Sequence, residues 1–396
     1  MFIKVTRNEA KEIIDSLTTQ KYYETITIDE AEERVLFEDI TAKFNIPESN
    51  KSAVDGYAIN VDNITFPAKL KVIDEAPAGE AQKELKNGAI FIMTGGVVPK
   101  GANAVVRIED VERDGEYIII KNPVKKGDLI NFEGEEVKEG EVVLKKGEVL
   151  DFKKVALLAN LGHFQIKVFR KIKIGIVVTG TEVKEPFEAL DKAGVKNSNL
   201  YILKGLLKPY CDITYYGKLP DNLEKMVEVF KNAIEENDIL LSSGGASKGK
   251  YDFTKEIAKQ IGIDIKFTTT NIRPGRPLIF GNKDTKLFFG LPGYPAALLV
   301  NAIEFLMPSI KKMAGISEYQ NRYFKAVLTK KAKAKTNRVD FIRGTVECNE
   351  KVTFTPACTQ QTSNYLSIAL SNALAVIDEN EGTKEAGEIV DVILIK

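Results

Sequence analysis

The sequence of 396 residues contains one histidine, His163, and no tryptophan. A catalytic triad that uses histidine would depend on His163, and a metal site with several histidine ligands is excluded. His163 follows Leu161 and Gly162 in an apolar stretch, which favours a packed or loop histidine over a catalytic one. We therefore expect carboxylates, lysines or hydroxyl groups to carry any acid–base chemistry.

Cysteine is scarce as well. The three cysteines, Cys211, Cys348 and Cys358, are odd in number and none lies in a C-x-x-C motif. This pattern argues against a framework of disulfide bonds and against a zinc site with thiolate ligands.

An excess of either charge is also missing, because Lys plus Arg and Asp plus Glu number 56 each. No bulk positive charge is available to bind a nucleic-acid backbone, so we expect no nucleic-acid partner and a local site for any anionic ligand. The lysine-rich segment 330–335 is typical of a solvated loop, or of an edge strand whose charges prevent pairing with another chain. No apolar run approaches the roughly 20 residues of a membrane span. Residues 6–17 resemble a polar helix rather than a signal peptide, so we expect a cytoplasmic protein with no membrane partner.

Helical and β-rich patterns alternate along the chain, and its length indicates several domains. Apolar residues at helical spacing follow a cap at Thr6 or Asn8, and a second short helix is expected at 29–35. Short alternating runs punctuated by glycines predict a β-rich region from 69 to 150. A further helix is expected at 151–161.

After residue 171, strands alternate with helices, as in a parallel sheet covered by helices on both faces. Short strands return after Gly315, which is typical of a small β-barrel or sandwich. We therefore predict an α/β plus β multidomain fold, with a central parallel α/β domain, an N-terminal helical and β-rich region and a C-terminal small β-barrel. The predicted domains are a helical linker domain (1–50 with 140–170), a β-rich domain (51–139), the α/β domain (171–316) and the barrel (317–396).

The most informative segment is the turn at 242–252, SSGGASKGKYD, which follows a predicted buried strand and precedes a helix. Ligands of open α/β sheets bind at the carboxyl ends of strands, and a glycine-rich turn there points backbone N–H groups at an anion. Residues 244–250 fit the P-loop pattern, but Tyr251 replaces the Ser or Thr that would bind Mg²⁺, which disfavours a Walker ATPase. A plain tight turn would explain the glycines but not the neighbouring Ser243, Ser247 and Asp252.

A second turn, at 179–182, closes the first strand of the same predicted sheet, so Glu182 and Asp252 should project at one edge. Two carboxylates beside a phosphate-binding edge can hold Mg²⁺ against a phosphoryl group. Asp221 could join them, although it is equally suited to cap the helix that follows.

Two loops later in the sheet carry Pro-Gly pairs, RPGR at 273–276 and GLPGYP at 290–295. Paired arginines on a rigid loop suit a tetrahedral oxyanion because the guanidinium group binds it with two donors. A salt-bridged surface turn is the alternative. The Pro-Gly pairs themselves suit structural scaffolding.

Compact polar turns also interrupt the N-terminal β-rich region, at 52–58 (SAVDGYA), 93–96 (MTGG) and 99–109 (PKGANAVVRIE). Each alone fits a β-turn, because Asp-Gly and Gly-Gly are favoured turn pairs. Their joint presence needs another explanation.

Taken together, these segments resemble the molybdopterin molybdenumtransferase family, which includes the C-terminal enzyme domain of gephyrin. The family pattern SAMDGYA resembles 52–58, with Val54 for Met, and its MTG and P-x-GADAVV turns resemble 93–106. The family turns TG-D/T-E, SGG-x-S-x-G-x-x-D and KPGKP resemble 179–182, 243–252 and 273–277. The resemblance covers nearly the whole chain in the family's order.

The resemblance implies a transferase that inserts molybdate into adenylylated molybdopterin, with Mg²⁺-dependent release of AMP, to form molybdenum cofactor. It also implies a homodimer whose cleft lies between the α/β domain of one chain and the N-terminal β domain of the other, with the pathway's adenylyltransferase as a partner. The implied catalytic residues are Asp55, Thr94, Glu182 and Asp252, and the implied metal ligands are Glu182, Asp221 and Asp252. The implied substrate-binding residues, including those at the oxyanion, are Ser243, Gly244, Gly245, Ser247, Lys248, Gly249, Arg273, Gly275, Arg276, Pro292, Gly293 and Arg343.

Three positions depart from the family pattern. The proline loop of the family commonly reads GLPGNPVS, whereas here Tyr294 replaces Asn and Ala297 replaces the Ser hydroxyl, so a molybdate contact expected there is lost. The C-terminal Ser-Gly turn is represented only by QQTSN at 360–364, where Thr362 and Ser363 are both candidates. Glu136 stands where the family usually has Asp, which keeps a carboxylate.

Two other functions share parts of this pattern. The sister molybdopterin adenylyltransferase resembles the α/β domain alone, so the long β segments at both ends argue against it. A gephyrin-like scaffold that clusters peptides would not need the cleft carboxylates. The preference between molybdate and tungstate stays open.

Overall fold

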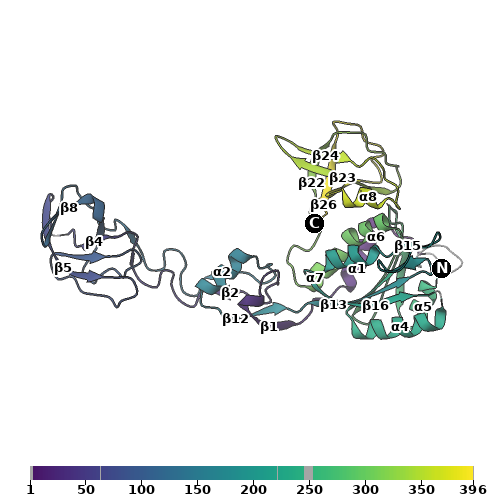
Figure 1. Cartoon of the computed structure of the whole chain (residues 1–396), viewed down its shortest axis with the longest axis horizontal. Coiled ribbons are helices and arrows are strands. Elements are labelled where there is room, and N and C mark those ends of the chain that lie inside the picture. The colour runs from purple at the N-terminus through teal and green to yellow at the C-terminus, as the bar shows by residue number, and fades with distance from the viewer. Residues whose placement is uncertain (1–2, 63, 221, 245–252, 396) are drawn as a thin grey trace. The chain divides into compact units, whose positions relative to one another are not determined.

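The computed structural model describes residues 3–62, 64–220, 222–244 and 253–395. The chain splits into two compact units (Figure 1). The first consists of Met1–Phe37, Lys146–Phe152 and Gln165–Lys396, and the second of Glu38–Lys145 and Lys153–Phe164.

A six-stranded sheet forms the centre of the first unit. Its strand order is β16 (Cys211–Leu219), β13 (Ile172–Thr179), β17 (Ile239–Ser243), β21 (Lys286–Leu291), β20 (Pro277–Lys283) and β18 (Asp264–Thr269). The first four strands are parallel, and β20 runs antiparallel to both of its neighbours. Strand β20 ends at Lys283 and β21 begins at Lys286. A connection this short joins antiparallel strands.

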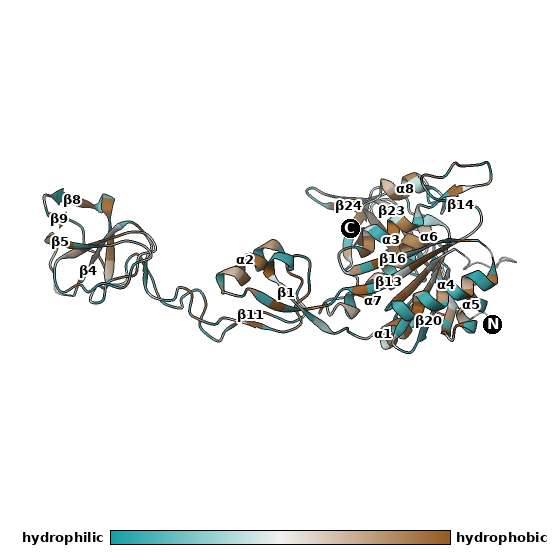
Figure 2. Cartoon of the chain, turned by 60° about the horizontal axis from the view of Figure 1, so that its bottom comes forward, coloured by the Kyte–Doolittle hydropathy of each residue, from teal (hydrophilic) through white to brown (hydrophobic). Residues whose placement is uncertain are grey.

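Helices cover both faces of this sheet. The helices α4 (Leu223–Glu236) and α5 (Thr254–Gln260) pack on one face (Figure 1). On the other face lie α1 (Arg7–Leu17), α3 (Asn199–Leu207) and α6 (Pro295–Asn301). Because both faces are buried, the central strands are apolar throughout, as the brown colour of the sheet in Figure 2 shows.

Successive residues of a strand point to opposite faces, which assigns each side chain to one of two cores. Ile176 and Leu241 pack in the core with α3 and α6, while Val177 and Leu240 pack in the core with α4 and α5. The same alternation points Ser243 to the α3 side of the sheet.

The helix predicted after a cap at Thr6 or Asn8 is present as α1. Helix α1 begins after Thr6, whose side chain and that of Glu9 form a reciprocal capping box. The helical segment that begins at Pro295 consists of α6, a π-helical turn η3 (Ala302–Leu306) and α7 (Met307–Met313).

The expected helix at 29–35 is wrong. Only a short 3₁₀ turn, η1 (Ile28–Glu30), forms there. Glu33 has a left-handed backbone with φ 64°, which ends any helix, and Val35 then forms a β-bridge with Val149. In the same part of the first unit β1 (Tyr23–Thr27) pairs with β12 (Gln165–Phe169).

The C-terminal residues of the first unit form a small barrel. Strand β25 pairs with both β26 and β23 and so closes five strands: β22 (Phe324–Leu328), β23 (Val339–Cys348), β24 (Val352–Pro356), β25 (Ala373–Ile377) and β26 (Ile389–Leu394). The short β19 (Ile272–Arg273) adds to β23 in parallel, and α8 (Tyr365–Ala369) lies between β24 and β25 in the chain. The first unit also contains the pair β14 (Val183–Lys184) and β15 (Val195–Lys196).

The second unit contains another six-stranded sheet. Its order is β7 (Ala104–Arg107), β4 (Gly56–Ile59), β6 (Ala89–Ile92), β5 (Ala68–Ala76), β9 (Tyr117–Ile120) and β8 (Val111–Asp114). A 3₁₀ turn, η2 (Ile108–Asp110), joins β7 to β8. Two short strand pairs join segments that come before and after this sheet in the chain. They are β2 (Ile40–Thr41) with β11 (Val142–Leu144), and β3 (Lys51–Ser52) with β10 (Ile130–Asn131). Helix α2 (Phe152–Asn160) follows β11 in the chain.

The predicted fold class is confirmed: the central α/β domain, the β-rich and helical N-terminal region and the C-terminal barrel are all present. The finer boundaries of four domains stay a prediction. Among the described residues, no helix combines the length and the apolar character that a membrane crossing requires.

Candidate active site

Three turns meet at the carboxyl edge of the central sheet, where β13, β17 and β21 end. The backbone N–H of Gly244 donates to the carbonyl oxygen of Leu291 at 3.1 Å, and the Thr179 hydroxyl donates to the carbonyl oxygen of Ser243 at 3.4 Å. Gly244 has φ +98°, and a Cβ added there would come within 2.6 Å of the Thr179 oxygen. Only glycine therefore permits this close approach.

Asn199, which the sequence motifs did not single out, connects two of these turns. It is buried at the start of α3, and its Nδ2 donates to Ser243 Oγ at 2.9 Å and to the Gly293 carbonyl oxygen at 2.8 Å. Both hydrogens of the amide are used, while Oδ1 has no hydrogen-bond partner among the described residues. An asparagine at the start of a helix also looks like a simple cap, so no separate sequence signal marks this role.

The predicted carboxylate Glu182 lies exposed in the turn between β13 and β14. Its carboxylate lies beside Gly180, where an added Cβ would be 2.7 Å from Glu182 Oε2. The carboxylate has no hydrogen bond or ion pair with another described residue. Glu182 is thus available to a ligand at the predicted edge of the sheet.

The other predicted metal ligands, Asp221 and Asp252, lie outside the described residues, as do Gly245, Ser247, Lys248 and Gly249. The cap of α4 is Asn222, whose Oδ1 accepts a hydrogen bond from the Lys225 backbone N–H at 3.0 Å. Within the described ranges, no three His, Cys, Asp or Glu side chains are grouped so that they could hold a metal. Because only Glu182 of the three predicted ligands is described, the magnesium site stays a prediction.

The arginine loop at 273–276 lies at the same edge of the sheet. It connects the end of β18 to the start of β20, and Thr269 pairs with Pro277 across these strands. Because β20 runs antiparallel to β21, its first residues lie beside the last residues of β21. The backbone N–H of Thr270 donates to the Arg276 carbonyl oxygen at 2.9 Å and closes the loop.

Both arginine side chains of this loop are exposed, whereas Pro274 and Gly275 are buried. Neither guanidinium group has a hydrogen-bond or ion-pair partner among the residues that the structure describes. The alternative of a salt-bridged surface turn therefore finds no support within these residues. Two unpaired cations on one loop can bind an anion.

Arg343, in contrast, is fully buried in β23. Its Nε donates to Ser367 Oγ at 3.1 Å and its Nη2 to the Gln361 carbonyl oxygen at 2.9 Å, while Nη1 has no hydrogen-bond partner within the described part of the chain. Burial lowers the pKa of its guanidinium group. The side chain holds the segment after β24 in place, and its predicted contact with an oxyanion stays a prediction.

The proline loop brings this C-terminal segment to the α/β domain. The backbone N–H of Ala296 donates to the Thr362 carbonyl oxygen at 3.3 Å. Tyr294, which replaces the family's Asn, is 62% exposed, and Ala297 is buried. Pro292 is buried and Gly293 is exposed. The hydrogen bond from Ala296 therefore places residues near Thr362 beside the loop at this edge of the sheet.

The second unit carries Asp55 and Thr94 on one pocket. Thr94 donates its backbone N–H at 2.7 Å and its hydroxyl at 2.8 Å to the same oxygen, Asp55 Oδ1. The backbone bond, followed by the hydroxyl bond, lowers the pKa of Asp55. The pocket has a volume of about 400 Å³ and is lined by Ala53, Val54, Asp55, Thr94, Arg107, Glu109 and Asp110.

Arg107 also lines this pocket, and in the sequence it appears only as part of the turn motif at 99–109. It pairs with Gly56 across β7 and β4, and the Ile108 backbone N–H donates to the Asp55 carbonyl oxygen at 3.2 Å. A Cβ added at Gly56 would come within 2.0 Å of the Val106 oxygen, so glycine is required for this pairing. The Arg107 side chain is exposed and has no partner among the described residues.

His163, the three cysteines and Glu136 are the remaining residues considered in the sequence. His163 is half-buried, and its Nε2 lies 3.2 Å from the Thr41 carbonyl oxygen. The three cysteines are free, and burial raises the pKa of the Cys211 thiol. Glu136, the counterpart of the family's Asp, is exposed.

Family models match the chain in three consecutive segments. They are described as "MoeA N-terminal region (domain I and II)" at residues 5–162, "Probable molybdopterin binding domain" at 175–312 and "MoeA C-terminal region (domain IV)" at 325–395. Together they cover most of the chain in order.

Relatives and solved structures match over nearly the full length. The molybdopterin molybdenumtransferase of Haemophilus influenzae is 32% identical over 397 residues, 98% of both sequences. That of Staphylococcus epidermidis is 32% identical over 378 residues, 93% of this chain and 90% of the relative. A crystal structure of the molybdopterin biosynthesis MoeA protein from Pyrococcus horikoshii has a TM-score of 0.85 at 33% identity and covers 99% of this chain and 100% of its own. The chain belongs to the MoeA family of molybdopterin molybdenumtransferases.

Proposed function

We propose that this chain inserts molybdate into adenylylated molybdopterin and releases AMP in a Mg²⁺-dependent reaction. The observation that carries the proposal is the pair Arg273 and Arg276, two exposed guanidinium groups without described partners at the edge where a glycine turn follows β17. An oxyanion and a phosphate are the ligands that such an edge suits. The family relationship supplies the identity of both.

The proposed roles follow from the chemistry of each group. Arg273 and Arg276 bind molybdate, and backbone N–H groups of the turn after Ser243 bind the phosphate or the pterin. Asn199 keeps this turn and Gly293 at a fixed separation through its two hydrogen bonds. The charged form of Asp55, which Thr94 favours, accepts hydrogen bonds from substrate N–H or O–H groups.

Magnesium fits the donors proposed for it, since Mg²⁺ prefers carboxylate oxygens and Glu182 offers a carboxylate without a described partner. Glu182, Asp252 and Asp221 would hold the ion, and Mg²⁺ bound there would neutralise charge on the phosphoanhydride.

We further propose a homodimer in which Asp55 and Thr94 of one chain complete the site that contains Glu182 of the other. The two groups of residues belong to different compact units of the chain. A contribution from two protomers is common in twofold symmetric enzymes, because each protomer supplies both halves once.

The sister adenylyltransferase remains the less favoured function, since the matched segments extend over the N-terminal and C-terminal regions as well as the α/β domain. No observation on the described residues favours a scaffold. The full set of family regions supports the transferase.

The test is to incubate the purified protein with adenylylated molybdopterin and Mg²⁺, with and without molybdate, and to measure AMP. We expect AMP release that molybdate stimulates, with a parallel tungstate series to compare the two oxyanions. A protein that binds the pterin but releases no additional AMP with molybdate would contradict the proposal.

A further inference from the structure

The arginine loop is fixed from one helix by two buried polar side chains, Asn301 and Glu304. Asn301 is the last residue of α6, and Glu304 lies in the π-helical turn η3 that follows. Both side chains are fully buried. Buried amides and carboxylates are costly unless they are hydrogen-bonded, so their partners indicate what they stabilise.

Asn301 holds the second half of the loop. Its Nδ2 donates to the Gly275 carbonyl oxygen at 3.0 Å and to the Pro277 carbonyl oxygen at 3.3 Å. Gly275 has φ +112°, and a Cβ added there would lie 3.0 Å from Asn301 Nδ2. The loop thus packs directly on this amide, on either side of Arg276.

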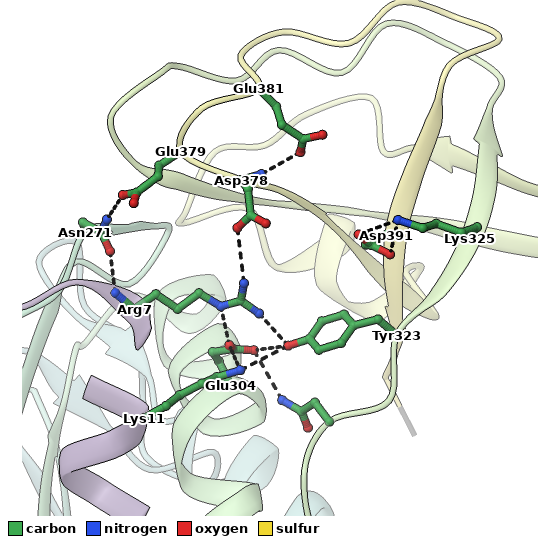
Figure 3. Close-up of polar contacts among 11 residues, drawn as sticks. Arg7, Lys11, Asn271, Glu304, Tyr323, Lys325, Asp378, Glu379, Glu381 and Asp391 are labelled. Atoms are coloured by element: carbon green, nitrogen blue, oxygen red, sulfur yellow. Dashed lines mark hydrogen bonds and ion pairs between the residues drawn. The ribbon is translucent and has the colours of Figure 1, made fainter. Parts of the chain in front are cut away.

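Glu304 stands at the centre of a network that reaches the first half of the loop (Figure 3). Its carboxylate accepts from Arg7 Nε at 2.6 Å and pairs with Lys11 Nζ at 2.6 Å. The hydroxyl of Tyr323 donates to its other oxygen at 3.0 Å, and Asn321 Nδ2 donates to the same oxygen at 3.3 Å. Every oxygen of this buried carboxylate is therefore compensated.

Arg7 also hydrogen-bonds to Asn271, which directly precedes β19. The backbone N–H of Arg7 donates to Asn271 Oδ1 at 2.7 Å, and the Asn271 side chain also hydrogen-bonds to Glu379 of the barrel. Figure 3 shows Asn271 between Arg7 and Glu379. The Asn271 carbonyl oxygen accepts from the Val339 backbone N–H at 3.0 Å. Asn271 is followed by Ile272 and then by Arg273.

We infer that Asn301 and Glu304 are positioning residues for the arginine loop. Asn301 positions Arg276. Glu304 positions Arg273 through Arg7 and Asn271. The inference rests on the proposed function in that the anion is molybdate. Neither residue touches the anion. Their effect is to hold two exposed cations a fixed distance apart, which matters because a binding site works only while its groups are held close to the productive geometry.

The decisive measurement is equilibrium binding of molybdate to the purified protein by calorimetry, with no pterin present. We expect Asn301→Ala and Glu304→Gln each to weaken molybdate binding about tenfold. In steady-state assays the same variants should raise the KM for molybdate while the KM for adenylylated molybdopterin changes little.

Matched controls lie at the opposite, amino edge of the same sheet. Asn237 is also a buried amide whose Nδ2 makes two hydrogen bonds, to the Ala233 carbonyl oxygen at 2.8 Å and the Tyr216 hydroxyl at 2.8 Å. Asp238 pairs with Arg170 at 2.8 Å and with Lys21 at 3.3 Å. Asn237→Ala and Asp238→Asn should lower the melting temperature while molybdate binding stays at the wild-type level.

The outcomes separate the two proposals. If the wild-type protein neither binds molybdate nor releases additional AMP in response to it, the proposed function fails. If it binds molybdate and a folded Asn301→Ala variant binds it equally well, the positioning inference is overturned and the proposed function stands. Should Glu304→Gln not fold, Asn301→Ala alone decides, because it leaves the charge network intact.

Discussion

Thr94 directs two hydrogen bonds to a single oxygen of Asp55, its backbone N–H at 2.7 Å and its hydroxyl at 2.8 Å. The other oxygen, Oδ2, accepts no hydrogen bond from a described residue, and both residues line the same pocket. The two bonds favour the charged carboxylate, so the pKa of Asp55 lies below its usual value. An exposed acceptor with fixed orientation is suited to bind a substrate donor.

Thr94→Val should shift the acidic limb of the pH dependence of kcat/KM to higher pH. Asp55 is needed in its charged form, which in the wild type persists as the pH falls to its lowered pKa. Removing the hydroxyl bond moves the pKa back toward the ordinary value, so activity is lost at a higher pH. The backbone bond remains, so the shift should be partial.

The shift can be checked without turnover by following the Asp55 carboxyl carbon in an NMR titration of wild type and variant. Thr41→Val, in the same unit but away from the pocket, serves as the control. A variant whose Asp55 titrates as in the wild type would show that the hydroxyl contributes nothing to the charged state.

The turns at this edge of the sheet could be predicted from the sequence because their backbone conformations require particular residues. Gly244 and Gly275 have positive φ, and neighbouring backbone or side-chain atoms leave little room for a Cβ at either position. The turns that contain them therefore appear in the sequence as glycine and proline motifs. Strand alternation and helix caps similarly located the sheet and α1.

The residues that connect these turns could not be found in this way. Asn199, Asn301 and Glu304 lie in helices, where an amide or a carboxylate is ordinary, and their importance depends on partners far along the chain. The burial of Arg343 is likewise a tertiary effect, since an arginine on a strand is normally expected at the surface. The segment 29–35 has residues that suit a helix, but Glu33 adopts a left-handed backbone conformation that a helix cannot contain.

Arg107→Ala should weaken binding of adenylylated molybdopterin while leaving the binding of molybdate alone unchanged. The guanidinium group has no described partner and lines the pocket with Asp55. We expect an effect of about tenfold, as for loss of a charge-assisted hydrogen bond to a ligand. Binding can be measured by calorimetry, with Arg113→Ala on β8 as a control outside the pocket; equal affinity in Arg107→Ala and Arg113→Ala would remove Arg107 from the site.

Arg276→Ala should raise the molybdate concentration for half-maximal rate more than it raises the KM for adenylylated molybdopterin. The exposed guanidinium group is expected to pair with the oxyanion. Arg322→Ala removes an exposed arginine that is engaged with Glu318 and provides the control. Equal weakening of both substrates by Arg276→Ala would place this residue on the phosphate instead.

Glu182→Gln should keep the fold and increase the Mg²⁺ concentration required for AMP release. The exposed side chain makes no described contact that folding requires, and the amide removes one negative charge from the proposed metal site. Activity measured against Mg²⁺ concentration tests this, with Glu224→Gln on the surface of α4 for comparison. An unchanged Mg²⁺ dependence at reduced turnover would assign Glu182 a role other than metal binding.

The last prediction concerns the proposed sharing of each site between two protomers. Asp55 and Glu182 belong to different compact units, and the proposal takes one from each chain of a homodimer. Homodimers of Asp55→Ala and of Glu182→Ala should both be inactive, because every site then lacks one of the two carboxylates. A mixed dimer with one chain of each kind has one site with both defects and one site with neither.

If the two sites of the symmetric dimer work independently, purified mixed dimers should regain about half of the wild-type activity per dimer. Chains mixed at random form mixed dimers half of the time, so the unfractionated mixture should reach about a quarter. A dimer of one wild-type chain and one chain carrying both substitutions is the control, since under sharing each of its sites lacks one carboxylate and it should be inactive. Activity in this control together with inactive mixed dimers would place Asp55 and Glu182 in a site formed by a single chain.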